Sequence, residues 1–375
     1  MAKTIGDVCN IVTGKLDANQ AVKDGRYPFF TCAEFPESID RYAFDDDVVL
    51  IAGNNARGNF HVSRYNGKFN AYQRTYVLTT KHGYDIDYIY YALKLELKRL
   101  REKSQGSQTK FLTMPILTSI PLGNLDETEY PRVSSVLKCL DKKIDLNNRI
   151  NAELESMAKT LYDYWFVQFD FPDANGKPYK TSGGKMVYNA TLKREIPVGW
   201  AIKKISEIAM IKAGGDKPKN YSDFSSEELS VPIYSNGISS EGLYGYTDVA
   251  IINEPSITVS ARGTIGYSVL RLKPFVPIIR LLVLIPYKEH VLKFLEETIK
   301  RFSFENSGSV QQQLTVPQMS ELLVLYPDDE ILKIYAERMQ PLIKKIELVK
   351  EQNSVLQQLR DWLLPLLMNG QVTVK

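Results

Sequence analysis

Two short segments of this sequence gather side chains that can hydrogen-bond a nucleic acid. Residues 106–115 read GSQTKFLTMP and residues 308–317 read GSVQQQLTVP. Glutamine can pair with an adenine edge through two hydrogen bonds, and serine or threonine can bond either a base or a phosphate. These residue types make both segments candidates for DNA contacts.

Other polar loops carry arginine or lysine beside glycine, asparagine or proline. A glycine next to Arg57 or Arg262 would let the backbone approach a phosphate closely while the guanidinium reaches into a groove. Two alternatives stay open: these loops are turns with solvated side chains, or each arginine pairs with an acid inside its own domain. The predicted DNA-contacting residues are Asn54, Asn55, Arg57, Asn59, Gln73, Arg74, Ser107, Gln108, Lys110, Lys217, Lys219, Asn236, Arg262, Thr264, Ser309, Gln311 and Gln312.

Motifs of the common catalytic and cofactor sites are missing from the sequence. There is no Gly-x-Gly dinucleotide fingerprint, no P-loop, no Gly-x-Ser-x-Gly nucleophile elbow and no Asn-Pro-Pro-aromatic segment of a base methyltransferase. The Pro-Asp pairs at 172–173 and 327–328 have no Glu-x-Lys downstream, which leaves a metal-dependent nuclease core unsupported. We therefore expect a chain that is not an enzyme and that binds no cofactor or metal ion.

Charge and cysteine content limit the partners and the compartment. The 375 residues include 47 Lys and Arg against 44 Asp and Glu, a formal net charge of +3. That charge is too small for strong non-specific binding to phosphates, so we expect weak DNA binding by the isolated chain. Three cysteines without a paired spacing, no signal peptide and no long apolar run predict a reduced cytoplasmic protein with no membrane segment.

The two Gly-Ser segments belong to a tandem duplication, because further matches between the two halves of the chain keep the same order. Those matches join residues 5–8 with 205–208, 27–31 with 231–235, and 56–58 with 261–263. One match could be chance, but four in order indicate two copies of one domain. The copies share a frame and differ in their polar residues, as expected if one scaffold is adapted to two short targets.

Each copy is predicted to be an α+β domain, because short β-runs alternate with turns and short helices. The predicted strands are 47–52 and 76–79 in the first copy and 256–260 and 281–285 in the second. The predicted short helices are 88–103 and 289–301. This order does not fit a nucleotide-binding βαβ fold.

A long helix follows each domain and carries the seam of a coiled coil. Mostly apolar residues recur at alternating steps of four and three. The first series is Val133, Leu137, Leu140, Ile144, Asn147, Asn151, Leu154, Ala158, Leu161 and Trp165. The second is Tyr335, Met339, Leu342, Ile346, Val349, Asn353, Leu356, Arg360, Leu363 and Leu367, with Arg360 as its one charged member. Each apolar stripe has to be covered, and two equivalent helices in one chain favour an antiparallel pair.

Asn151 and Asn353 occupy equivalent seam positions near the middle of their helices. In an antiparallel pair related by a twofold axis they would lie close together and fix the register, at a cost in stability. The alternative is a partly solvated Asn without a partner. The aromatic residues at 162–171 are too dense for a free helix face. We assign helix pairing or partner docking to Asn151, Asn353, Trp165, Phe166 and Trp362.

These signals divide the chain into five parts. They are a first domain at 1–127, a spacer helix at 128–168, a connector at 169–199 that is rich in Pro, Gly and Asn, a second domain at 200–328, and a second spacer helix with a tail at 329–375. The predicted fold class is α+β. Two globular domains related by a pseudo-twofold axis are separated by a long antiparallel two-helix coiled coil.

The layout resembles the specificity subunit of type I restriction–modification enzymes over essentially the whole chain. The duplicated domain-plus-helix plan and the Gly-Ser segments carry the resemblance, together with LYDYWFVQFDFP at 161–172 and IPVGW at 196–200. The resemblance implies that each domain is a target recognition domain for one half of a bipartite double-stranded DNA site. It also implies that the paired helices set the gap between the halves.

The resemblance further implies docking to two modification subunits, which bind S-adenosylmethionine and methylate adenine. Restriction subunits, which use ATP and Mg²⁺ to move along DNA and cut it, would join them, and this chain itself would hold no cofactor. Two alternatives remain: a helical adaptor that does not read DNA, and a solitary DNA-modifying enzyme with no familiar motif. Target-specific binding would argue against the first, and intrinsic activity of the isolated chain would support the second.

Overall fold

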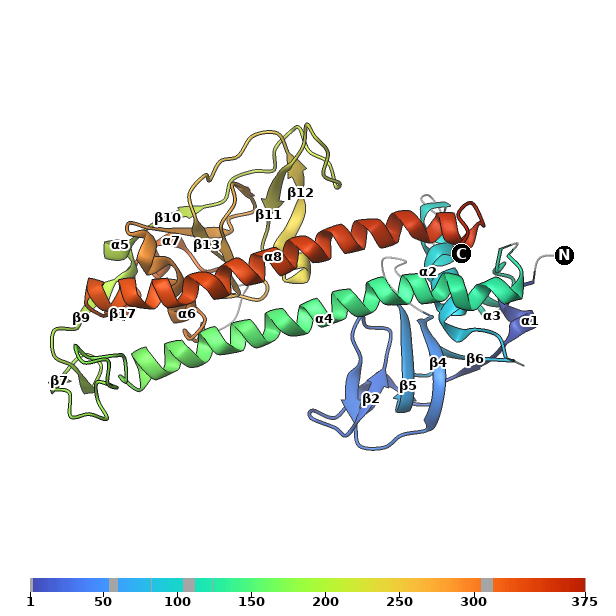
Figure 1. Ribbon diagram of the computed structural model, residues 1–375, viewed down its shortest axis with the longest axis horizontal. Coiled ribbons are helices and arrows are strands. Elements are labelled where there is room, and N and C mark those ends of the chain that lie inside the picture. The colour runs from blue at the N-terminus through green and yellow to red at the C-terminus, as the bar shows by residue number, and fades with distance from the viewer. Residues whose placement is uncertain are drawn as a thin grey trace. The chain divides into compact units, whose positions relative to one another are not determined.

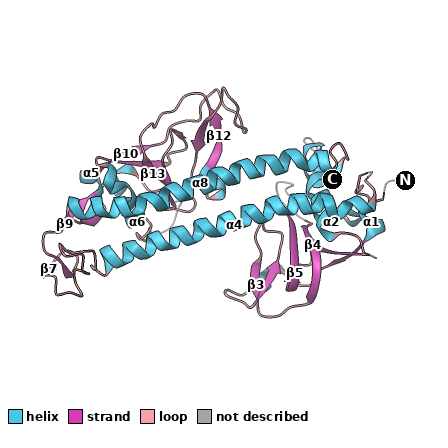
Figure 2. Cartoon of the chain, viewed as in Figure 1, coloured by secondary structure: helices cyan, strands magenta, loops and turns pink. Residues whose placement is uncertain are grey.

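A computed structural model describes residues 3–53, 60–81, 83–103, 112–123, 125–304 and 313–374. The chain divides into two compact units. The first unit comprises Met1–Arg149 and Val349–Lys375, and the second comprises Ile150–Leu348. Helices and strands occur in both units (Figure 2), which confirms the predicted α+β class.

The first unit is built on a six-stranded sheet with the strand order β1-β6-β4-β5-β2-β3. β4 lies inside the sheet, and its second half is apolar and buried, as expected of a strand covered on both faces. The helix α2 (Ile86–Lys103) packs against β4 and β5 (Figure 1). The strands are β1 Cys9–Thr13, β2 Tyr27–Phe30, β3 Glu37–Ile39, β4 Phe44–Ala52, β5 Val62–Ala71 and β6 Thr75–Thr80. Shorter helical segments are α1 Ile5–Val8, η1 Ala18–Gln20, α3 Met114–Thr118 and η2 Glu127–Glu129.

The second unit has its main strands in two sheets, β10-β16-β13-β14 and β12-β11-β15, beside the small sheets β17-β9 and β7-β8. Its strands are β7 Met186–Asn189, β8 Arg194–Pro197, β9 Ala201–Lys204, β10 Ala209–Ala213, β11 Val231–Tyr234, β12 Leu243–Thr247, β13 Ser256–Val259, β14 Ser268–Arg271, β15 Val276–Pro277, β16 Leu282–Pro286 and β17 Leu323–Tyr326. Its short helical segments are α5 Ile205–Ile208, η4 Ser239–Gly242, η5 Glu289–Val291, α6 Leu292–Ile299 and α7 Val316–Glu321.

The two units repeat the same strand pairing. The antiparallel set β1-β6-β4 corresponds to β10-β16-β13, and the antiparallel pair β2-β3 corresponds to β11-β12. β5 runs unbroken in the first unit, whereas its counterpart in the second is divided into β14 and β15, with Pro274 between them. Proline has no amide hydrogen to donate to a sheet, which accounts for two sheets in the second unit where the first has one.

The predicted short elements are present. The four strands are β4, β6, β13 and β16, and the two helices are α2 and the pair η5 and α6. The segment predicted as a connector is more than a linker, because it contains the β7-β8 hairpin. Its Phe169, Phe171 and Ile196 are buried in the core of the second unit.

The two long helices are α4 (Tyr130–Tyr162), which continues as a π-helical turn η3 (Asp163–Val167), and α8 (Asp329–Met368). None of the predicted seam positions is exposed. In the first unit, Val133 of α4 and Leu367 of α8 belong to one buried cluster. In the second unit, Tyr162 packs edge-on against Tyr335. Each fully buried large side chain of the seam contributes about 1.5–3 kcal/mol of hydrophobic free energy, so the pairing stabilises both helices.

The seam asparagine has a different partner from the one predicted. Asn353 Oδ1 accepts a hydrogen bond of 2.9 Å from Asn147 Nδ2, and Asn353 Nδ2 donates one of 2.8 Å to Asn148 Oδ1. The register of the helix pair places Asn147, one turn before Asn151, opposite Asn353. The Oδ1 atom of Asn151 is buried and accepts no hydrogen bond from the described residues. The prediction of an Asn151–Asn353 pair was therefore wrong by one helical turn, and the buried amide pair is Asn147–Asn353.

The one charged residue of the seam, Arg360, is compensated across the helix pair. Its guanidinium donates to Asp141 Oδ1 of α4 at 2.8 Å and also bonds Asp361 on its own helix. The other oxygen of Asp141 accepts the hydroxyl of Tyr91 from α2, again at 2.8 Å. Since Asp141 meets Arg360 and Asn147 meets Asn353, residue numbers fall along α8 as they rise along α4, and the segments in the first unit are antiparallel.

We predict that Asn353→Ala lowers the free energy of unfolding by about 1–3 kcal/mol, because it leaves the buried amide of Asn147 without a partner. The double variant Asn147→Leu/Asn353→Leu should recover stability, since it removes both polar groups together. Urea denaturation followed by circular dichroism measures both effects. The control is Gln357→Ala, an exposed position on the same helix. Equal midpoints for Asn353→Ala and Gln357→Ala would contradict the pairing.

Candidate nucleic-acid interface

Asn236 joins two polar loops of the second unit. Its Nδ2 atom donates to the carbonyl of Ile279 at 2.7 Å, and its Oδ1 atom accepts the amide of Ala261 at 2.7 Å. Both ends of this amide are therefore bonded to backbone, on the turn between β15 and β16 and on the loop after β13. The predicted DNA-contacting residue Asn236 is placed to hold these loops in position.

A third segment meets the loop after β13. The amide of Leu314, at the end of the second Gly-Ser segment, donates to the carbonyl of Ala261 at 3.0 Å. The guanidinium of Arg262 donates to Oε1 of Gln313 at 2.7 and 3.2 Å. Among the described residues, Arg262 bonds this neutral amide and pairs with no acid. Its side chain is exposed.

The first unit has the same three-segment arrangement. The amide of Gly53 donates to the carbonyl of Arg74 at 2.8 Å, and the amide of Leu112 donates to the carbonyl of Gly53 at 3.0 Å. Gly53 follows β4 as Ala261 follows β13, so Gly53 is the counterpart of Ala261. The predicted match of residues 56–58 with 261–263 lies outside the described residues in the first copy, where the described counterpart of Ala261 is Gly53.

We call these segments the three-segment interface. In the first unit it consists of Gly53, the turn Tyr72–Thr75 and Leu112, and in the second of residues 261–264, the turn Ile278–Leu281 and residues 313–314. Ten predicted DNA-contacting residues lie outside the described residues. They are Asn54, Asn55, Arg57, Asn59, Ser107, Gln108, Lys110, Ser309, Gln311 and Gln312.

Of the other predicted residues, Asn236 is half-buried and the rest are exposed. Gln73 Nε2 donates to Asp17 Oδ1 at 2.6 Å, while the guanidinium of Arg74 makes no hydrogen bond or ion pair with any described residue. Lys219 and Thr264 are exposed as well. All four can reach a ligand without rearrangement of the core.

Lys217 lies between two tyrosine rings. Its ammonium is 3.6 Å from the ring centroid of Tyr221 and 5.8 Å from that of Tyr244. A hydrogen bond with Tyr221 raises the pKa of Lys217 above its ordinary value, so the side chain stays charged. Both rings are partly exposed. A cation beside aromatic faces suits a phosphate together with a base or sugar.

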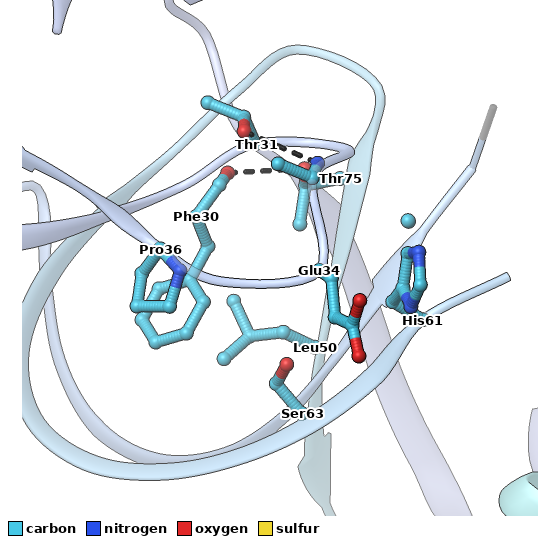
Figure 3. A pocket seen from close by; sticks show the side chains of 10 residues that line it. Phe30, Thr31, Glu34, Pro36, Leu50, His61, Ser63 and Thr75 are labelled. Carbon is cyan, nitrogen blue, oxygen red and sulfur yellow. Dashed lines mark hydrogen bonds between the residues drawn. The ribbon is translucent and has the colours of Figure 1, made fainter. Parts of the chain in front are cut away.

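A small pocket lies beside the interface of the first unit. Thr75 Oγ1 donates to the carbonyl of Phe30 along its wall, and Glu34 and His61 lie next to each other at one end (Figure 3). Its volume is about 10 Å³, which is room for roughly one water molecule. The pocket is therefore too small to receive an extruded base.

The described residues contain no group of three or more His, Cys, Asp or Glu side chains arranged to hold a metal ion. Nor does any helix in the described part of the chain combine the length and apolar character that crossing a membrane requires. These two findings concern only the residues that the structure describes.

The predicted docking residues differ in exposure. Trp165 and Phe166 are buried and pack against Tyr335, so they serve helix pairing in the second unit. Trp362 is 63% exposed on α8 of the first unit. Val355 and Leu359 precede it at steps of three and four and are exposed too, so α8 presents an apolar stripe on the side away from its seam.

Residues 1–156 and 197–358 of the chain match a known protein family, described as the type I restriction modification DNA specificity domain. These two stretches cover most of both units. The chain belongs to this specificity family. The matched stretches include both copies of the three-segment interface, and the resemblance seen in the sequence is confirmed.

Relatives within the specificity family come from several organisms. The EcoDI type I restriction enzyme specificity subunit of Escherichia coli is 31% identical over 58% of this chain and 50% of that protein. The chain therefore spans about half the length of this relative. A type I specificity subunit of Mycoplasma pneumoniae is 28% identical over 96% of this chain and 97% of that protein.

One solved structure is similar over nearly the whole chain. It is the S subunit of a type I restriction–modification system from M. genitalium, with a TM-score of 0.54 and 18% identity over 98% of this chain and 95% of that chain. At this identity the similarity concerns the fold alone. It supports the duplicated domain-plus-helix plan that the sequence predicted for a member of the specificity family.

Proposed function

We propose that this chain is the DNA-reading specificity subunit of a type I restriction–modification complex, in which each unit reads one half of a bipartite double-stranded site. The observation that carries the proposal is the three-segment interface, which occurs once in each unit on equivalent strands. Its backbone frame is shared, but its side chains differ. Gly53 of the first unit stands where the second has Ala261. Beside the interface, Cys32 lies two residues after β2, where the second unit has Asn236 two residues after β11.

The chain is proposed to recognise DNA and to leave chemistry to its partners. The support is that the sequence lacks a dinucleotide fingerprint, a P-loop and a methyltransferase segment. Two modification subunits would supply S-adenosylmethionine and adenine methylation, and restriction subunits would supply ATP- and Mg²⁺-dependent cleavage. Binding of the chain alone is expected to be weak, since a net charge of +3 releases few counterions.

The exposed apolar stripe of α8 is proposed as a docking surface for a modification subunit. Val355, Leu359 and Trp362 lie on one helix face, and exposed apolar side chains in a row are typical of protein interfaces. Trp362 is its anchor, because tryptophan is the residue type most enriched among those that dominate binding energy.

The first experiment compares the methylomes of cells that carry this chain with its companion modification subunit and of cells that lack the chain. We predict adenine methylation at a new split motif, two short defined blocks around a fixed undefined gap. The purified chain with methyl donor, or with Mg²⁺, should modify and cut nothing by itself. Chain-dependent methylation at one uninterrupted block would contradict reading by two units.

The two rival functions are distinguished by these cells together with cells that carry the chain but lack the companion. An adaptor without DNA readout would leave the methylome unchanged although the modification subunit is active. A solitary enzyme would modify DNA in cells that lack the companion. Either result would overturn the proposed function.

The docking surface is tested with Trp362→Ala. This variant should weaken binding of the modification subunit by roughly tenfold or more, because truncating a buried aromatic anchor typically has such an effect. Isothermal titration with the purified modification subunit measures the affinity. The control is Tyr188→Ala, which removes a similarly exposed aromatic side chain from β7. Equal affinities for the two variants would rule out the stripe as the docking surface.

A further inference from the structure

One turn of the three-segment interface is built by the same backbone bonds in both units. In the first unit, the amide of Tyr72 donates to Phe30, that of Gln73 to Leu16, and that of Thr75 to Tyr72, at 2.9, 2.9 and 2.8 Å. In the second unit, the amide of Ile278 donates to Tyr234, that of Ile279 to Gly215, and that of Leu281 to Ile278, at 2.9, 2.9 and 3.1 Å. Ile279–Arg280 is therefore the counterpart of Gln73–Arg74.

Arginine occupies the same place in both turns. Arg74 and Arg280 are both exposed, and neither guanidinium makes a hydrogen bond or an ion pair with a described residue. Their charges are thus available to a phosphate or to a guanine edge. The residue before each arginine differs between the units, glutamine in the first and isoleucine in the second.

The turn of the second unit holds an unfavourable backbone conformation. Ile279 has a φ of +52° and Arg280 a φ of +58°, in the left-handed region that favours glycine and asparagine. The first-unit turn has no positive φ at Gln73 or Arg74. For a β-branched residue this conformation is a genuine outlier, and such outliers cluster at ligand-binding sites.

Ile279 lies outside the hydrophobic core formed by the described residues. The side chain of Ile279 is 47% exposed and belongs to none of the buried clusters. Its carbonyl is held by Asn236, the same amide that holds the loop of Arg262. Ile279 and Arg280 therefore lie on one loop and Arg262 on another, and the side chain of Asn236 joins the two loops.

We propose that Ile279 and Arg280 form a base-reading element of the second unit, in which Arg280 anchors the DNA and Ile279 contacts the methyl group of a thymine. The proposal rests on the proposed function and names a specificity-determining pair within it. An apolar side chain at a major-groove edge favours the thymine methyl, whereas the glutamine at the equivalent place suits adenine. The two units would then discriminate bases with the same turn and a different residue.

The test measures adenine methylation in vitro by the complex of this chain with its modification subunit. Duplexes carry deoxyuridine in place of each thymine of the target in turn, which removes one methyl group at a time. For the unaltered complex we expect the rate to fall about tenfold at one thymine of one half-site, as for loss of a specific base contact. The variant Ile279→Gly should be insensitive to that substitution.

Ile279→Gly separates recognition from folding. Glycine is favoured at the observed φ, so the variant keeps the turn and loses only the side chain. Its melting temperature should equal or exceed that of the unaltered chain. Ile251→Ala, which truncates an aliphatic side chain of the same unit exposed to 59%, should retain the deoxyuridine effect. Arg280→Ala should slow methylation on every duplex by a similar factor.

The outcomes distinguish this proposal from the one it rests on. If the unaltered complex methylates no split motif, the proposed function itself fails. If it methylates a split motif but shows no position sensitive to deoxyuridine, or if Ile279→Gly retains that sensitivity, the assignment of Ile279 is overturned while the proposed function stands. Unchanged rates with Arg280→Ala would overturn the anchoring role of Arg280.

Discussion

Two apolar helix stripes, one on α4 and one on α8, bury each other, and both units include them in their cores. Neither α4 nor α8 could remain a solvated helix with such a stripe exposed, because each stripe holds large aliphatic or aromatic side chains over several turns. The Asn147–Asn353 pair and the Asp141–Arg360 pair add direction and register, since each polar group is satisfied only at one alignment of the helices. Hydrophobic burial thus supplies the stability of the pair, and the polar pairs select its alignment.

The helices are also part of each unit's core. In the first unit, Leu367 and Met368 of α8 belong to the cluster that contains α2 and β4 residues. In the second, Trp165 and Phe166 belong to the cluster that contains β13 and α6 residues. The strands that carry the three-segment interface therefore pack with the long helices in each unit's core, and the loops extend from this core. A preordered loop loses less conformational entropy when it binds, which favours recognition.

The sequence predicted the features that depend on periodicity and failed on those that depend on alignment between segments. The seam could be predicted because its residues keep alternating steps of four and three along both long helices. The partner of Asn353 could not be, since moving one helix by a turn preserves the spacing and changes the partner from Asn151 to Asn147. The equivalence of Gly53 and Ala261 was likewise not predicted, because it follows from strand pairing and not from residue type.

The turn at Ile279–Arg280 was not predicted because it contains none of the residues that favour turns, which are Gly, Asn, Asp and Pro. Instead, two non-glycine residues adopt a positive φ under constraint from the surrounding structure. The predicted strand at 281–285 begins directly after these two residues, and no element was predicted for them. The duplication could have revealed the turn, because Arg74 follows β5 in the first copy and Arg280 follows the equivalent strand β15 in the second. The prediction of Asn236 as a DNA contact rested on its residue type and stays a prediction, and its amide is bonded to backbone.

The proposed function requires that the three-segment interface contact DNA in both units. Hydrogen–deuterium exchange of the assembled complex, bound to its target duplex or to an unrelated duplex, tests this requirement. We expect slower exchange on the target at 72–75, 261–264 and 278–281, and unchanged exchange in the β7-β8 hairpin. Protection confined to one unit, or absent from all three segments while the complex is bound to its target, would contradict it.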